Sequence, residues 1–549
     1  MACKAAGLGL LTGLATSDAG RPLLPESPGA TLRAVPTAED FDPRAMTPLP
    51  RLRNVAPALI STLVLAAGPA ALQAQDARLP VDTAVTTTHE VTIRGTRVPY
   101  TATVGTQPVF DGRGEAVASL LYTFYRRTDV DDDRDRPLFI SFNGGPGSAS
   151  IWMHIGYTGP KQLVIDPEGF PVQPYGIRDN PHSILDVGDI VFVNPVNVGF
   201  SRIVGDADRS QFFGVNEDIA YLADWIGTFV TRHDRWLSPK FLIGESYGTT
   251  RVSGLARALQ GRQWMYLNGV ILVSPTGLGV DRQGPVGDAL QLPNYTATAW
   301  YHGVLDPALQ ARDLDEILPE VEAFTLNQYI PALARGGSLQ GTQRERIAGE
   351  IARWAGVSAT WVLDHNLRPS VGEFRKELLR DQGLTVGRLD ARYKGLDGAN
   401  AGESYDYDPA LSAWNHAFAP AMNDYIRNDL GFETDLQYWL FGPVNPWNRQ
   451  GDETGEDLRR AMSENPNLHL FVQSGYYDGG TDYFSAKYTM WNLDPAGRLQ
   501  DRMRFEGYRS GHMMYLRAED LERSNQDIRD FVTWSLTNVS RPAGYGIGR

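Results

Sequence analysis

The feature that most limits the possible folds of this chain is a serine placed between two glycines. Residues 244–248 read Gly-Glu-Ser-Tyr-Gly, follow the apolar run Phe241–Ile243 and precede a segment with helical character. Glycines permit a tight turn and a close approach of neighbouring backbones, and such a turn between a strand and a helix holds the serine out of the sheet. Ser246 is therefore a candidate nucleophile. Because the chain has 56 glycines, the pentapeptide alone also fits an ordinary strand–turn–helix junction.

Composition narrows the classes of protein that the chain can represent. A length of 549 residues suffices for a large core and for more than one structural unit. The net charge is −14 and no basic stripe occurs, so we expect no nucleic-acid partner. The single cysteine, Cys3, excludes intrachain disulfides, and within the folded region it leaves no cysteine nucleophile or cysteine-based metal site.

The N-terminal region has the pattern of an export signal that begins at an internal methionine. Residues 1–45 show no sustained period and are interpreted as an upstream extension. Residues 46–74 combine two arginines, the apolar stretch Val55–Ala71 and a final Ala74 that resembles a cleavage site. Arginine far outnumbers lysine, an association with GC-rich bacterial genomes. We expect a periplasmic or secreted bacterial protein without stable membrane insertion after cleavage; a long leader or a membrane anchor is the alternative.

The chain beyond residue 75 alternates strand and helix patterns, which indicates a mostly parallel sheet with helices on both faces. Strand candidates are Val91–Tyr100, Leu120–Arg126, Leu138–Phe142, Ile190–Val193, Phe241–Ile243, Gly269–Val273, Leu468–Gln473 and Arg502–Tyr508. Helix candidates are 216–232 and 520–536, and between them Pro307–Leu314, Leu318–Leu333, Gln343–Ala355 and Ser370–Leu379. We therefore expect an α/β core in two parts, 75–280 and 448–549, with a helical insertion over 281–447 that caps the sheet.

A serine nucleophile needs an adjacent base, which a third group orients. In the α/β-hydrolase fold, which the pattern favours, the chain order is serine, then an acid, then histidine. Of the nine histidines, His512 alone follows the last strand, so it is the candidate base. Asp478, just beyond the strand 468–473, is the candidate acid, and Asp482 in the same loop is its competitor.

Acyl transfer also needs backbone N–H groups that stabilise the developing oxyanion. One donor normally follows the nucleophile, which here is the amide of Tyr247, and the other comes from a glycine-rich loop after an earlier strand. The loop Asn143–Gly147 follows Leu138–Phe142, and Gly145 is the expected donor. A phosphate-binding loop is disfavoured because no Lys-Ser/Thr pair follows these glycines. We expect no cofactor and no metal ion.

Five segments together resemble the serine carboxypeptidase family. They are Asn-Gly-Gly-Pro-Gly-Ser within Leu138–Ser150, Asn197–Ser201, Gly244–Gly248, Ser474–Asp478 and Gly511–Met513. The resemblance implies a serine-type carboxypeptidase, which releases the C-terminal amino acid of a peptide through an acyl-enzyme. It also implies that Asn143 and Glu245 help to hold the substrate's terminal carboxylate.

The chain departs from the family pattern in three places. Ser148 stands where family members of secretory pathways usually have cysteine, and the sequence around Asn194-Pro195 is altered. Counting along the chain places Tyr157 where the family has a second glutamate, opposite Glu245. Two facing carboxyls can share a proton, whereas a tyrosine and a carboxyl cannot do so in the same way. The sequence therefore predicts neither the pH optimum nor whether the protein acts strictly as an exopeptidase.

The residues also leave room for other functions. An acyltransferase or esterase on the same scaffold would use the same acyl-enzyme, and an inactive binding protein would need no intact Ser246, Asp478 and His512. Peptides are the expected substrates. The preferred side chain and the oligomeric state are not readable from the sequence.

Overall fold

The computed structural model of the protein describes residues 79–537. The expected extension 1–45 and signal peptide 46–74 lie outside these residues. None of the helices in the described range is long and apolar enough to cross a membrane.

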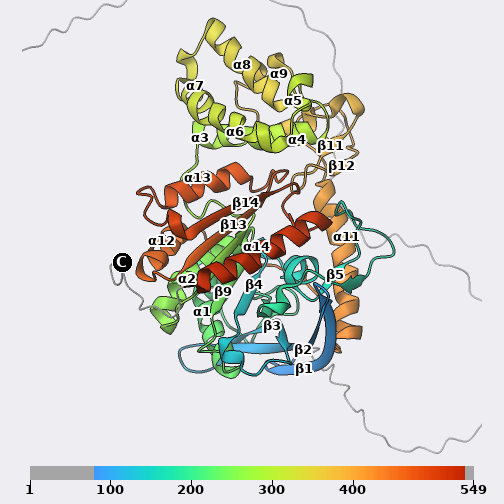
Figure 1. Cartoon of the computed structure of the whole chain (residues 1–549), viewed down its shortest axis with the longest axis vertical. Coiled ribbons are helices and arrows are strands. Elements are labelled where there is room, and N and C mark those ends of the chain that lie inside the picture. The colour runs from blue at the N-terminus through green and yellow to red at the C-terminus, as the bar shows by residue number, and fades with distance from the viewer. Residues whose placement is uncertain (1–78, 538–549) are drawn as a thin grey trace, which may run out of the picture. The chain divides into compact units, whose positions relative to one another are not determined.

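A ten-stranded mixed sheet forms the centre of the fold (Figure 1). Its strands are β1 Thr83–Ile93, β2 Thr96–Phe110, β3 Ala116–Arg127, β4 Leu138–Phe142, β7 Asp189–Val193, β8 Arg202–Ile203, β9 Lys240–Glu245, β10 Gly269–Val273, β13 His469–Gly475 and β14 Met503–Tyr508. Their order is β1-β2-β3-β7-β4-β9-β10-β13-β14, with β8 beside β3. Strands β1, β2, β3 and β7 pair antiparallel, and all pairs from β7 to β14 are parallel. The expected mostly parallel sheet is confirmed.

The first predicted strand is wrong, because 91–100 contains a hairpin turn. Strand β1 ends at Ile93 and β2 begins at Thr96, and the turn residues Arg94 and Gly95 both have positive φ. Buried Val91 and Ile93 precede the turn, and buried Val98 and Tyr100 follow it. The buried positions change from odd to even across the turn, and this change of phase is so short that the two strands read as one in the sequence.

Alternating side chains of the parallel strands divide between two apolar cores, one on each face of the sheet. Val270 and Leu272 of β10 pack in the core that contains residues of α1 Val215–Arg232, α2 Tyr247–Gln263 and α12 Thr454–Glu464. Ile271 and Val273 pack in the core that contains residues of α11 Pro409–Asp424 and α14 Ala518–Leu536. Burial on both faces explains the continuous apolar runs of these strands.

Helices with a core of their own follow β10. They are α3 Pro285–Leu290, α4 Leu292–Tyr301, α5 Pro307–Gln310, α6 Leu314–Phe324, α7 Ile330–Ala334, α8 Gly341–Ala355, α9 Ala359–Asp364 and α10 Val371–Glu377. The short ladders β11 Thr385–Val386 with β12 Lys394–Gly395, and β5 Lys161–Leu163 with β6 Ile177–Asp179, stand apart from the main sheet. Helix α13 Tyr483–Leu493 contacts α3 and α4. The helical character of the insertion is confirmed, and its limits at 281 and 447 stay a prediction.

Two helices of the insertion differ from their predicted extents. The pattern over 307–314 covers α5 and the start of α6, which are separate because Asp306 and Asp313 each accept a hydrogen bond from a backbone N–H at a new helix start. The pattern over 318–333 covers the rest of α6, a wider helical turn at Thr325–Tyr329, and α7. An aspartate N-cap starts a new helix wherever it satisfies free N–H groups, whatever the apolar period.

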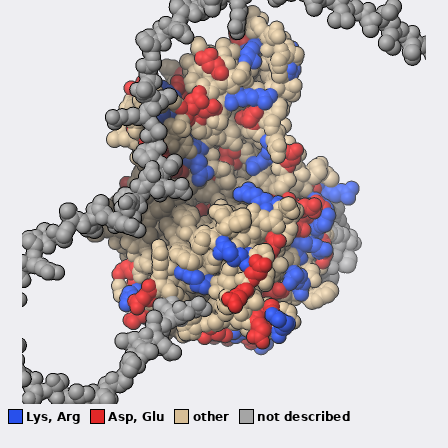
Figure 2. Space-filling view, turned by 180° about the vertical axis from the view of Figure 1, so that it is seen from behind, with Lys and Arg blue, Asp and Glu red and all other residues tan. Residues whose placement is uncertain are grey.

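Charges of both signs lie close together on one face of the molecule. Figure 2 shows lysine and arginine side chains interspersed with aspartate and glutamate over the described part of one face. That face presents no continuous basic surface of the kind that nucleic-acid-binding proteins use.

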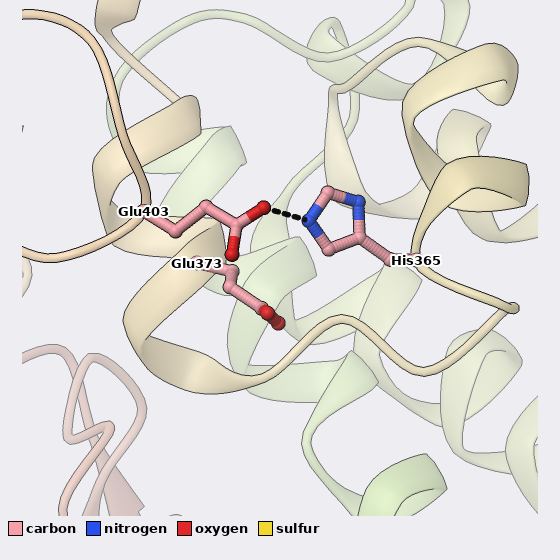
Figure 3. Close-up of side chains that lie close together, drawn as sticks. All are labelled: His365, Glu373 and Glu403. Carbon is pink, nitrogen blue, oxygen red and sulfur yellow. Dashed lines mark ion pairs between the residues drawn. The ribbon is translucent and has the colours of Figure 1, made fainter. Parts of the chain in front are cut away.

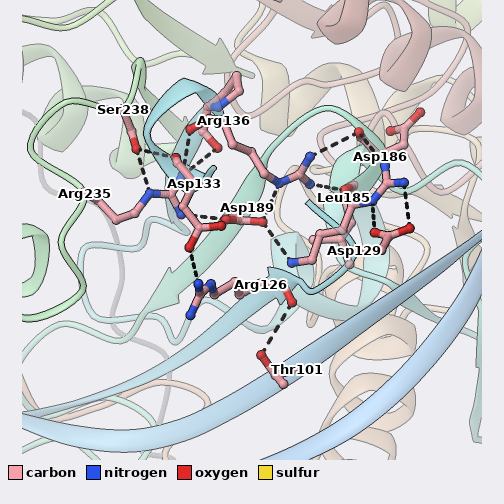
Figure 4. Close-up of polar contacts among 12 residues, drawn as sticks. Thr101, Arg126, Asp129, Asp133, Arg136, Leu185, Asp186, Asp189, Arg235 and Ser238 are labelled. Carbon is pink, nitrogen blue, oxygen red and sulfur yellow. Dashed lines mark hydrogen bonds and ion pairs between the residues drawn. The ribbon is translucent and has the colours of Figure 1, made fainter. Parts of the chain in front are cut away.

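A buried carboxylate with two arginine partners lies at the start of β7 (Figure 4). Asp189 Oδ1 accepts from Arg136 Nε at 2.7 Å and its Oδ2 accepts from Arg235 Nη1 at 2.6 Å. Arg235 Nε also donates to Ser238 Oγ at 2.7 Å. Asp189 and Arg235 are at most 1% exposed. This network is at the amino ends of the parallel strands, whereas Ser246 follows the carboxyl end of β9.

Replacing Asp189 by alanine is expected to lower the free energy of unfolding by about 3 to 5 kcal/mol, because two buried guanidinium groups lose their counter-charge. Urea titration followed by circular dichroism measures the change. Asp179→Ala is the matched control: it removes an ion pair to Lys161 in which Asp179 is 55% exposed, and such surface pairs contribute less than about 1 kcal/mol. Similar small losses in both variants would contradict the structural role of the network.

Candidate active site

Ser246 occupies a strained turn between β9 and α2. Its φ is 58° and its ψ is −126°, a conformation that costs non-glycine residues about 1 to 3 kcal/mol. The Ser246 amide donates to Val273 O of β10 at 3.0 Å, and its carbonyl accepts from Thr249 N at 2.9 Å. A Cβ on Gly244 would lie 2.3 Å from Gly248 O, so the turn needs a glycine there. The sequence prediction placed Ser246 at this turn, and the structure has it there.

The structure brings the candidate base and acid together. His512 Nδ1 lies 2.7 Å from Asp478 Oδ2, and both side chains are buried. Asp478 follows β13 and His512 follows β14, so adjacent parallel strands deliver the two residues to one edge of the sheet. A carboxylate in this position favours the tautomer with the proton on Nδ1, in which Nε2 is free to accept a proton. Ser246 and His512 line the same cleft.

Further hydrogen bonds hold the acid in its orientation. Asp478 Oδ1 accepts from the amides of Gly480 at 2.7 Å and Thr481 at 3.1 Å. The Thr481 hydroxyl donates to Asp478 Oδ2 at 2.7 Å. Asp482, the competing candidate, instead caps α13 by accepting from Ser485 N at 2.7 Å. Nothing in the sequence of this loop indicated that Thr481 would hold Asp478 in place.

The glycine-rich loop lies directly against the serine turn. A Cβ on Gly144 would come within 2.4 Å of the Tyr247 amide nitrogen and 2.9 Å of Ser246 Cβ, so only glycine fits there. Gly145 has a φ of 104° and, like Gly144, lines the cleft. Tyr247 is the first residue of α2, where a helix leaves its N–H without an internal partner. The two expected oxyanion donors therefore come from adjacent backbones.

Arg251 ties the glycine-rich loop to the helix that begins with the serine turn. It is buried on α2, pairs with Asp218 Oδ2 at 2.7 Å, and donates to the carbonyl of Asn143 at 2.8 Å and of Pro146 at 3.3 Å. Its guanidinium thus sets the position of the loop relative to Ser246. The sequence offered no signal for this residue, because the contact joins segments that are 108 residues apart.

Glu245 is a buried carboxyl with polar partners, next to Ser246 in the chain. Asn143 Nδ2 donates to Glu245 Oε2 at 3.1 Å, and the Tyr515 hydroxyl donates to the same oxygen. His512 Nε2 lies 4.0 Å from Glu245 Oε1. The predicted neighbours Asn143 and Glu245 are thus in contact, and both line the cleft.

Tyr157 does not lie opposite Glu245, so that placement was wrong. Its hydroxyl donates to Gln473 Oε1 at 2.7 Å, and its ring stacks on Tyr515 with centroids 4.4 Å apart. Tyr515 supplies the hydroxyl that donates to Glu245. Tyr157 is fully buried behind the Tyr515 ring. Counting from the glycine-rich loop could not reveal a partner that comes from the segment after His512.

The ionisation of the three buried groups is coupled. Burial raises the pKa of Glu245 to about 7, against the opposing effects of the His512 charge and of hydrogen bonds from Tyr515 and Asn143. Burial would lower the pKa of His512, but the Asp478 carboxylate outweighs it and the pKa is raised. Burial likewise opposes ionisation of Asp478, yet His512 and the hydrogen bonds of Thr481 hold the pKa of Asp478 below its usual value. Asp478 is therefore the ionised partner of the histidine at neutral pH.

The cleft around Ser246 has a volume of about 240 Å³ and joins a polar floor to an apolar wall. Asn143, Glu245 and the glycine-rich loop form the polar part. Side chains of the apolar part are Trp152, Leu389, Leu411, Phe441 and Met513. Leu389 and Leu411 come from the chain between β10 and β13, so this region contributes to the lining of the cleft.

Residues 388–391 connect the two loops that carry Asp478 and His512. Leu389 O accepts from His512 N at 2.6 Å, Arg388 O accepts from Gly479 N at 3.0 Å, and Ala391 N donates to Tyr477 O at 3.0 Å. These backbone bonds run alongside both loops. The segment therefore helps to position the acid and the base as well as to line the cleft.

A histidine and two glutamates in the insertion have the composition of a metal site (Figure 3). Potential ligand atoms of His365, Glu373 and Glu403 all lie within 4.8 Å of one another. Glu373 Oε2, however, accepts from Ser370 N at 2.6 Å in a capping box at the start of α10. His365 Nε2 lies 3.3 Å from Glu403 Oε1. We interpret the group as a helix cap beside a contact between a histidine and an exposed glutamate.

The fold is that of an α/β-hydrolase. Its strand order fits this fold, and the serine, the acid and the histidine follow β9, β13 and β14 in turn. A family model described as serine carboxypeptidase matches residues 111–322. The predicted resemblance to the serine carboxypeptidase family is confirmed by that match. The matched segment contains the glycine-rich loop and Ser246, and Asp478 and His512 lie beyond it.

Among curated proteins, serine carboxypeptidase-like 31 of Arabidopsis thaliana is 24% identical over 218 residues, which cover 37% of this chain and 39% of the plant protein. A pheromone-processing carboxypeptidase of Saccharomyces cerevisiae is 28% identical over 151 residues, which cover 26% of this chain and 20% of the yeast protein. The matches thus span about two fifths and one fifth of the relatives' lengths.

Solved structures of similar chains include a prohormone-processing carboxypeptidase of Saccharomyces cerevisiae. It has a TM-score of 0.46 and 15% identity, with 79% of this chain and 91% of the yeast chain covered. An esterase from Thermogutta terrifontis has a TM-score of 0.31 and 12% identity, with 82% of this chain and 99% of that chain covered.

Proposed function

We propose that the protein is a serine-type carboxypeptidase that releases C-terminal amino acids from peptides through an acyl-enzyme. The observation that carries this proposal is the buried Asn143–Glu245 pair in the cleft of Ser246. A general esterase needs a nucleophile, a base and oxyanion donors, but it has no need for an amide and a carboxyl next to the leaving group. In a carboxypeptidase this pair would receive the terminal carboxylate of the peptide.

The geometry supports a two-step reaction. Ser246 Oγ would attack the peptide carbonyl while His512 Nε2 takes its proton, and Asp478 would stabilise the resulting imidazolium. The amides of Gly145 and Tyr247 would bind the oxyanion. His512 would then protonate the leaving amino group, and water, activated by the same histidine, would hydrolyse the acyl-enzyme.

The apolar wall supports a preference for peptides with apolar side chains near the scissile bond. Trp152 and Phe441 pack with ring centroids 5.5 Å apart, and Phe441 is 49% exposed. A ligand that covered this ring would remove apolar surface from water, which stabilises binding by about 25 cal/mol per Å². We further propose that the protein acts after export to the periplasm or beyond.

Glu245 is expected to control the pH dependence of peptide binding, with KM for a free-acid peptide rising as pH increases through about 7. Below this pKa the protonated Glu245 carboxyl can donate a hydrogen bond to the substrate carboxylate, and above it the ionised Glu245 repels that carboxylate. Glu245→Gln keeps a donor and removes the charge, so it should flatten the KM–pH curve while kcat stays within about tenfold.

The measurement compares benzyloxycarbonyl-Phe-Leu with its C-terminal amide between pH 5 and pH 9, in the wild type and in Glu245→Gln. Release of leucine from the free acid tests the proposed activity itself. The amide, which has no terminal charge, is the internal control and should show a weaker pH dependence of KM. If KM of acid and amide change in parallel with pH in both proteins, Glu245 does not bind the carboxylate, and the esterase or acyltransferase alternative is favoured.

A further inference from the structure

The cleft of Ser246 contains one permanently charged cation among its lining residues, Arg388. Glu245 and His512 are the other ionisable residues that line it. Asp478 stands behind His512 and is occupied by the imidazole. A positive group therefore borders the space into which a substrate of Ser246 must enter.

The backbone of Arg388 is held firmly. Its amide donates to Asp408 Oδ1 at 3.0 Å, and its carbonyl accepts from Gly479 N at 3.0 Å. The Arg388 guanidinium lies directly against the backbone of Gly480. A Cβ on Gly480 would lie only 3.1 Å from Arg388 Nη1, so a glycine there leaves room for the arginine side chain. The guanidinium is thus positioned beside the loop of Asp478 by two segments of the chain.

The side chain of Arg388 is weakly engaged by comparison with the other arginines near the site. Its Nε is 3.9 Å from Asp408 Oδ2, and the side chain is 43% exposed. Arg251, by contrast, is fully buried and pairs with Asp218 at 2.7 Å. Asp408 also caps α11 and accepts from the amides of Leu389 and Ala410. A loosely paired guanidinium at the border of a cleft is free to bind an incoming anion.

We propose that Arg388 binds a carboxylate of the substrate and so makes the enzyme selective for anionic peptides. The inference rests on the proposed hydrolase function of the same cleft. The carboxylate belongs either to the C-terminus of the peptide or to an acidic side chain next to the scissile bond, since the chemistry is the same. Glu245 can accommodate such a group only while it is protonated. The charge of a guanidinium does not depend on the ionisation of a neighbouring carboxyl, so Arg388 keeps anion recognition in place when Glu245 ionises.

Arg388→Gln is expected to raise KM for the anionic substrate by about 10- to 100-fold, the range expected for a lost charge-assisted hydrogen bond, with little change in kcat. Three substrates separate the sources of the carboxylate: benzyloxycarbonyl-Phe-Leu, its amide, and benzyloxycarbonyl-Glu-Leu amide. A selective loss for the first substrate assigns Arg388 to the terminal carboxylate, and a selective loss for the third assigns it to an acidic side chain. Arg388→Lys should retain part of the selectivity because it keeps the charge.

Arg346→Gln is the matched control, since it removes the same charge from the exposed surface of α8, where Arg346 contacts Gln328 at 3.2 Å. Equal changes for all three substrates, or the same shift in Arg346→Gln, would overturn the inference.

A binding measurement separates this inference from the proposed function. Calorimetry with Ser246→Ala and benzyloxycarbonyl-Phe-Leu, its amide and the glutamyl amide needs no turnover. Loss of an anion preference on adding Arg388→Gln supports the inference. An unchanged order of affinities refutes it, even if the wild type hydrolyses all three substrates. Absence of hydrolysis in the wild type would refute the proposed function instead.

Discussion

Replacing Ser246 by alanine is expected to reduce hydrolysis of peptides and esters by about 10⁴-fold or more, because the acyl-enzyme can no longer form. Alanine keeps the Cβ at this strained turn, so the fold and the glycine-rich loop should be unchanged. Ser253→Ala is the matched control: it removes a buried hydroxyl from the same helix, α2, and should leave the rate within a few fold.

Covalent labelling provides an independent measurement of the same expectation. A fluorophosphonate should modify the wild type and Ser253→Ala at one residue, which peptide mapping identifies as Ser246. It should not modify Ser246→Ala. Labelling that persists in Ser246→Ala would show that another residue is the nucleophile.

The second large effect is expected for Asp478→Asn, with a loss of about 10⁴-fold in kcat. Asparagine can still accept from the amides of Gly480 and Thr481 through its carbonyl oxygen. Its NH₂ group would then face His512 Nδ1, which favours the tautomer whose Nε2 carries the proton. The histidine would lose its ability to accept the serine proton.

Asp482→Asn tests the competing assignment of the acid. Asp482 caps α13 and accepts from Gln291 Nε2 at 2.8 Å, and asparagine is an equally good capping residue. We expect a kcat within a few fold of the wild type and a similar melting temperature. Losses of equal size in both variants, at unchanged stability, would transfer the role of the acid to Asp482.

Several parts of the fold were predictable because they depend on local sequence. The central strands are short and buried on both faces, so their apolar runs mark them with little ambiguity, as in Gly269–Val273. Ser246 and Asp478 follow two such strands, β9 and β13, and His512 follows the partly exposed edge strand β14. Because parallel strands end at one edge of the sheet, their order along the chain was enough to predict that they would meet.

Other parts of the site depend on contacts between distant segments, which the sequence does not display. Tyr515 reaches Glu245 across 270 residues, and Arg251 reaches the glycine-rich loop across 108 residues. Arg388 belongs to a stretch without a helical or strand period that could have singled it out. The hairpin at Arg94-Gly95 was missed for a different reason: each of its strands alternates apolar and polar residues, and the change of phase at the two-residue turn is easily overlooked.

The three backbone bonds of residues 388–391 set a limit on how this enzyme can be redesigned or diversified. Residues 388–391 line the cleft and also hold the loops of Asp478 and His512. Substrate selectivity and catalytic rate therefore depend on the same few backbone hydrogen bonds. We expect libraries at Leu389 and its neighbours to yield broad-specificity variants mostly at the expense of rate. If the helical insertion were exchanged for that of a homologue, the loops around residues 478 and 512 would have to be exchanged with it. During evolution, the outer helices of the insertion could lengthen more freely than residues 388–391 could change.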